Sequence, residues 1–181
     1  IWYVGMNVTQ PPFDNPKVRL ALNLAVDRAA ISKQIYGGHA DFPHLPMDET
    51  WEGYFTPPEK MPNEAREVLQ YDPAKAKKLL AEAGLANGFE FKAQVPSFPE
   101  QLKKAQIVAG YLSAIGVKMT IEPKEYGAFL SLMTTGKHGP GYWHFAGMSN
   151  PTASIEKLYR SFSVWNSARV NDPKGDAALD T

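Results

Sequence analysis

Five aromatic and imidazole side chains are the best candidates for a ligand site in this sequence. Tyr142, Trp143 and His144 form a dense run after a His-Gly-Pro-Gly turn, and Phe98 and Tyr126 follow the ends of two predicted strands. Ligand sites of α/β proteins gather beyond the carboxyl ends of strands and are mostly apolar, with a few directed polar groups. Because strand side chains alternate between faces, about half of the run at 142–145 is expected to face the core instead.

The titratable residues make no comparable case for catalysis or metal binding. The four histidines are scattered over separate predicted elements, and neither an HxxxH nor an HExxH pairing occurs. A serine nucleophile is unsupported, because the sequence has no Gly-x-Ser-x-Gly motif. The acidic pairs Glu122–Glu125 and Asp48–Glu49 could serve acid–base hydrolysis, but nothing in the sequence places either pair in a closed pocket. We therefore predict no catalytic residue, no metal site and no cofactor.

Composition narrows the class of protein further. The 181 residues carry a formal net charge of +0, which argues against a partner bound through bulk electrostatics, such as nucleic acid. The absence of cysteine removes disulfides, thiolate catalysis and cysteine-based metal sites. No apolar run approaches the roughly 20 residues that a membrane-spanning helix needs. These features are typical of a globular domain with a substantial core.

The elements that must position the candidate residues follow from capping signals and hydrophobic periodicity. Asn15–Pro16 and Asp72–Pro73 are typical helix starts, and Gly84 and Gly116 are typical helix ends. Arg19, Asp27 and Arg28 fall near the edge of a buried helix face, where structural ion pairing or solvation is the expected role. The expected helices are 16–36, 63–70, 73–83, 99–115, 125–135 and 152–162, and the expected strands are 2–8, 89–95, 117–122 and 142–147. This mixture predicts the α/β class, with a mixed β-sheet flanked by helices.

The segment 37–62 interrupts this regular pattern. It contains five prolines and is longer than most structureless connections, so it is either functional or packed as a scaffold. We favour an irregular, proline-rich wrap around a single α/β unit that spans 1–181.

Three ordered motifs resemble one protein family. PPFDNPKVRLALNLAVDRAAI at 11–31, YDPAKAKKLLAEAGLANGFEF at 71–91 and LSAIGVKMTIEPKEYGAFL at 112–130 are similar to segments of the family 5 extracellular solute-binding proteins. These proteins are receptors of ABC importers that capture peptides, nickel or sugars between two lobes. The resemblance implies that the chain is the second lobe of a longer, two-lobed receptor. It also implies periplasmic or cell-surface-anchored localisation.

The same resemblance implies the partners and one departure from the family pattern. The expected partners are a small-molecule or peptide ligand, the other lobe of the receptor and the ABC permease. In oligopeptide-binding members an aspartate near the cleft grips the ligand's terminal amine, whereas alignment on Ser149–Asn150–Pro151 places Gly147 there. This chain is therefore expected to bind a peptide in another way, or a different solute.

We predict solute capture by closure of two lobes around a ligand. An extracytoplasmic hydrolase domain that acts on peptides or glycans is the main alternative, and it requires a nucleophile and a base that converge in the structure. A stand-alone interaction module is the second alternative.

Overall fold

The computed structural model describes residues 2–39, 52–53, 55–145 and 151–180. Its strands are β1 (Trp2–Met6), β2 (Phe89–Pro96), β3 (Val117–Lys124) and β4 (Gly141–Phe145). Its helices are α1 (Pro16–Leu24), α2 (Arg28–Tyr36), α3 (Asn63–Glu67), α4 (Pro73–Glu82), α5 (Pro99–Ser113), α6 (Tyr126–Thr135), α7 (Pro151–Tyr159) and α8 (Pro173–Ala178), and a 3₁₀ turn covers Pro58–Lys60. Among these helices, none is both long and apolar enough to span a bilayer.

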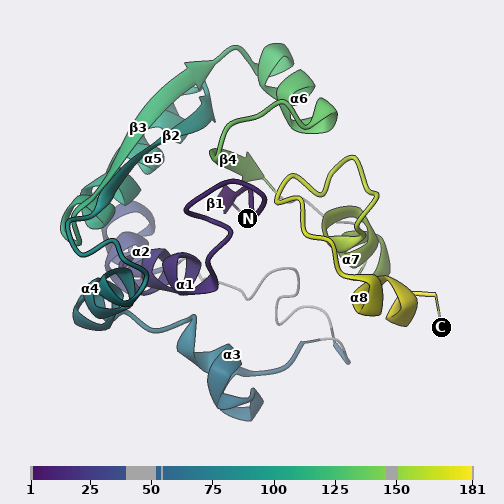
Figure 1. Ribbon diagram of the computed structural model, residues 1–181, viewed down its shortest axis with the longest axis horizontal. Helices are drawn as coiled ribbons and strands as arrows, with labels where there is room; N and C mark the ends of the chain where they lie inside the picture. The colour runs from purple at the N-terminus through teal and green to yellow at the C-terminus, as the bar shows by residue number, and fades with distance from the viewer. Residues whose placement is uncertain (1, 40–51, 54, 146–150, 181) are drawn as a thin grey trace.

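The four strands form one mixed sheet, as the sequence predicts. Their order is β1-β4-β2-β3, with β1 antiparallel to β4 and the other neighbours parallel. The pairing of β2 with β3 runs in register from Phe89↔Val117 to Pro96↔Lys124, so the two strands end together at one edge. Figure 1 shows α6 beside this edge, and α7 and α8 on the far side of β1 and β4 from α2 and α4.

The main core lies between α1, α4, α5 and one face of the sheet. Phe13, Val18, Leu24, Leu80, Val95, Val117 and Trp143 are among its buried members. A smaller cluster of Phe129, Met133 and Tyr142 lies beneath α6. Tyr142 and Trp143 are neighbours in β4 and belong to different clusters, so both faces of this strand are covered.

The helix starts that the sequence predicts are confirmed. The side-chain oxygen of Asn15 accepts the backbone N–H of Lys17 at 2.9 Å, and that of Asp72 accepts the N–H of Lys75 at 2.8 Å. In both helices a proline follows the capping residue, where its missing N–H leaves no hydrogen bond unmade.

The prediction of one helix over 16–36 is wrong, because α1 ends at Leu24 and a second helix begins at Arg28. Asp27 leaves the helical conformation, and its carboxylate accepts the N–H of Ala30 at 2.8 Å, so it caps a new helix. The Arg28 guanidinium donates to the Asn23 carbonyl at 3.2 Å, at the end of α1. Arg28 therefore has a structural role, but through hydrogen bonds to Asn23 and not through the ion pairing or solvation that the sequence predicts.

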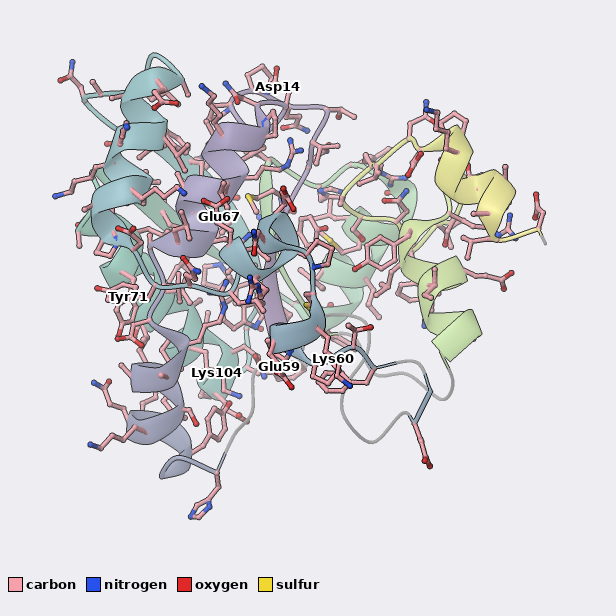
Figure 2. All side chains as sticks on the ribbon, turned by 90° about the horizontal axis from the view of Figure 1, so that it is seen from below. Asp14, Glu59, Lys60, Glu67, Tyr71 and Lys104 are labelled. Atoms are coloured by element: carbon pink, nitrogen blue, oxygen red, sulfur yellow. The ribbon has the colours of Figure 1, made fainter. Side chains whose placement is uncertain are left out.

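The connection from α3 to α4 packs against the end of α1. The Asp72 N–H donates to the Leu24 carbonyl at 2.8 Å, and Glu67 pairs with Lys75. Figure 2 shows this region from below, with Glu67 labelled at the end of α3 and Tyr71 labelled on the connection. Half of the predicted wrap at 37–62, residues 40–51 and 54, lies outside the described residues, and its described part includes the 3₁₀ turn at Pro58–Lys60.

Candidate functional site

An exposed aromatic pair lies where the parallel strands β2 and β3 end. The rings of Phe98 and Tyr126 contact each other with centroids 5.5 Å apart and an interplanar angle of 48°. Phe98 is 47% exposed and Tyr126 is 48% exposed, so about half of each side chain remains open to a ligand. We name these two side chains the edge pair.

Local backbone structure brings the edge pair together. Phe98 occupies the N-cap position of α5, and Tyr126 is the first residue of α6. The Ser97 N–H donates to the Lys124 carbonyl at 2.8 Å, which joins the two chain segments just beyond the strands. The residues at 97–100 and 125–128 are all exposed, so the pair lies on an open surface.

Charged side chains lie along β2 and β3 just before the edge pair. The Glu122 carboxylate lies 3.0 Å from the Lys92 ammonium and 3.9 Å from that of Lys124. Glu125 caps α6 by accepting the Ala128 N–H at 3.0 Å. Hydrogen bonds from the backbone N–H groups at the start of α6, that of Gly127 first, hold the pKa of the Glu125 carboxyl below its ordinary value.

The acidic pair Glu122–Glu125 therefore serves structure. The Glu122 carboxylate pairs with Lys92 of β2 and Lys124 of its own strand, and the Glu125 carboxylate accepts a backbone N–H at the start of α6. An aromatic surface with lysine and glutamate at its margin can bind a ligand through apolar contact and aim its polar groups. Among the described residues, no group of three or more His, Asp or Glu side chains could hold a metal ion.

The structure does not bring Tyr142 and Trp143 to this surface. Tyr142 is 1% exposed and lies against His138, with ring centroids 5.0 Å apart. Trp143 is 4% exposed in the main core, and its indole N–H donates to Gln101 Oε1 at 2.8 Å. Both fill the core because the main core covers one face of β4 and α6 covers the other. The side chain of His144 lies outside what the structure describes, and so does Gly147.

Gln101 is a buried residue at this edge that the sequence analysis misses. It is 4% exposed and lies on the same helical face as Ala105 and Leu112. A glutamine at helical spacing from buried apolar residues is the signal that could have revealed it, because buried amides are hydrogen-bonded.

Comparison with known proteins places this geometry in a family. Residues 1–166 match the family described as bacterial extracellular solute-binding proteins, family 5 middle. The chain belongs to this family. The motifs at 11–31, 71–91 and 112–130 all fall inside the matched region, so the predicted resemblance is confirmed.

Three relatives show how this family member compares with named proteins. It is 33% identical to heme-binding protein A of Haemophilus influenzae, with 98% of this chain and 32% of that protein covered. It is 33% identical to di/tripeptide-binding protein 1 of Pseudomonas aeruginosa, with coverage of 99% and 34%. A glutathione-binding protein of Salmonella typhimurium is 38% identical over 69% of this chain and 23% of its own length. All three names are those of binding proteins, and they give no support to the hydrolase alternative.

Solved structures agree with the fold. HbpA2 from Haemophilus parasuis superposes with a TM-score of 0.82 at 28% identity, over 99% of this chain and 36% of that one. DppA from Helicobacter pylori, in complex with the peptide STSA, superposes with a TM-score of 0.72 at 28% identity, over 98% and 37%. The chain thus spans about a third of the length of these relatives. It has the fold of one lobe of a periplasmic binding protein.

Proposed function

We propose that this protein captures a small solute, such as a peptide, for an ABC importer, and that the edge pair contacts the ligand. The observation that carries the proposal is the exposed contact of Phe98 with Tyr126 beyond the carboxyl ends of two parallel strands. Open α/β sheets bind ligands at such edges. The names of the relatives support the choice of a binding protein over an enzyme.

The edge pair supplies one wall of a binding cleft. Half-exposed rings lose their remaining water contact when a ligand covers them, which gives broad apolar affinity without a fixed ligand shape. Lys124 and Glu122 at the margin would orient a charged or zwitterionic solute. A second lobe, closing by a hinge motion, would supply the opposite wall and present the closed receptor to the permease. This function places the protein in the periplasm or at the cell surface.

The proposal is tested by identifying the ligand and then removing the rings. Native mass spectrometry of the full-length protein would identify a co-purifying solute, and calorimetric titration would measure its affinity beside glutathione, trialanine and hemin. We expect Phe98→Ala and Tyr126→Ala each to weaken binding about fivefold or more, which corresponds to about 1 kcal/mol for an aromatic anchor.

Tyr71→Ala is the matched control. Tyr71 is 49% exposed and contacts a second aromatic ring, that of Tyr111, with centroids 6.2 Å apart, but it lies on the connection from α3 to α4. Its loss should leave affinity unchanged. Wild-type affinity in both edge-pair variants would contradict the proposal.

A further inference from the structure

The two rings of the edge pair are held by different means. Tyr126 begins α6, where the Glu125 carboxylate caps the helix through the Ala128 N–H at 3.0 Å. Phe98 occupies the N-cap position of α5, as Glu125 does in α6, but its side chain has no oxygen that could accept a backbone N–H. Helix ends without a side-chain cap fray more readily than capped ends. The Ser97–Lys124 backbone hydrogen bond fixes the chain just before α5, so the first turn of α5 needs a restraint of its own if Phe98 is to stay against Tyr126.

The hydrogen bond between Gln101 and Trp143 supplies that restraint. Gln101 lies in the first turn of α5, and its backbone N–H donates to the Phe98 carbonyl at 2.9 Å. Its side-chain oxygen accepts the Trp143 indole N–H at 2.8 Å, and both side chains are buried. Trp143 is itself fixed in the sheet, opposite Val4 of β1. A chain of contacts thus runs from the centre of the sheet, through Gln101, to the backbone that carries Phe98.

Burial makes this hydrogen bond specific. If α5 began in another position, the indole N–H and the amide oxygen would both lose their partner away from water, and an unsatisfied buried polar group is costly. An apolar contact at the same place would tolerate a small shift of the helix, because dispersion is not directional. A buried donor–acceptor pair does not tolerate such a shift, because its geometry is directional.

We propose that Gln101 is a positioning residue for the ligand site, acting through Trp143 and the first turn of α5 to hold Phe98 against Tyr126. The role in ligand binding rests on the function proposed above, whereas the positioning itself can be measured without a ligand. Gln101 contacts the core and not the exposed surface, so its loss changes affinity by displacing Phe98.

Fluorine NMR of the full-length protein, labelled with 3-fluorotyrosine, tests the positioning directly. The Tyr126→Phe variant assigns the Tyr126 resonance, and Phe98→Ala gives its frequency when the neighbouring ring is absent. We expect Gln101→Leu to move the Tyr126 resonance more than halfway toward the Phe98→Ala frequency, or to broaden it through motion of the ring.

Two further variants separate positioning from general loss of stability. Leu112→Ala opens a buried site at the far end of α5 and should lower the melting temperature while leaving the Tyr126 resonance in place. The double variant Gln101→Leu with Trp143→Phe removes donor and acceptor together. It should therefore regain part of the stability that Gln101→Leu alone loses, while the Tyr126 resonance stays displaced. A wild-type resonance in the double variant, or an equal displacement in Leu112→Ala, would overturn the proposal. Displaced resonances with unchanged ligand affinity would instead refute the ligand site at the edge pair.

Discussion

We expect Gly88→Ala to destabilise the protein far more than Gly84→Ala. Both glycines have left-handed backbones, with φ of +75° at Gly88 and +80° at Gly84. A Cβ at position 88 would lie 1.8 Å from the carbonyl oxygen of Gly116, whereas a Cβ at position 84 would meet nothing within 4 Å. The two variants therefore share the conformational strain and differ in the steric clash.

The magnitudes follow from this difference. A left-handed alanine costs about 1–2 kcal/mol, and this cost applies at both positions. The clash at position 88 is with backbone, which cannot rotate away, so the starts of β2 and β3 must separate. Overpacking of this kind costs roughly 1–3 kcal/mol more. We therefore expect a loss of about 1–2 kcal/mol for Gly84→Ala and about 2–5 kcal/mol for Gly88→Ala.

Urea unfolding followed by circular dichroism measures both values. With a slope of about 1–3 kcal/mol per molar urea, the two midpoints should differ measurably while the slopes stay equal. Coincident midpoints for the two variants would refute the reasoning, since the contact with Gly116 would then have no energetic weight.

Three further results are expected. Burial keeps the pKa of His138 below its ordinary value of 6.5, so the unfolded chain takes up a proton at a higher pH than the folded protein does. The free energy of unfolding should therefore fall as the pH drops below about 6.5. Urea midpoints measured at pH 7 and pH 5 should show a smaller fall in His138→Gln than in the wild type. Asp27→Ala should cost about 0.5–2 kcal/mol by removing the cap of α2, and Asp27→Asn should restore most of that stability in thermal unfolding. Trp143→Ala should cost about 3–5 kcal/mol because the indole is buried, and Phe98→Ala should cost clearly less; similar melting temperatures for these two variants would show that the assigned burial is incorrect.

Local signals in the sequence predict much of this fold. The caps at Asn15 and Asp72 need only the side chain and the next few N–H groups, so their residue types suffice to locate them. The same locality explains the error at Asp27, since an aspartate in a helical pattern is compatible with an exposed helix position and with a cap. Contacts from outside the segment bear on which of the two forms, such as the Asp72 N–H that donates to the Leu24 carbonyl where α1 ends, and no local pattern contains them.

The candidate site was predictable only in part, for a related reason. Phe98 and Tyr126 follow predicted strands, and parallel pairing brings the strand ends to one edge. For Tyr142 and Trp143, alternation correctly separates the two side chains onto opposite faces. Whether each face is covered depends on what packs on either side of the sheet, and here the main core covers Trp143 while Phe129 and Met133 of α6 cover Tyr142. Such packing is a long-range property, so the burial of both residues was beyond the sequence pattern.

The pairing of β1 with β4 has a consequence for how the chain folds. Trp2 pairs with Phe145, so the first strand closes a loop through nearly the whole sheet-forming sequence. A chain that emerges from its N-terminus at 5–20 residues per second leaves β1 without its partner for roughly 7–28 s. During that interval its backbone N–H and C=O groups are an unpaired edge, the kind of template that recruits other chains. Of the four described strands, β1 is thus made before the others and paired late, and the yield of native protein depends on how well β1 is shielded until β4 arrives.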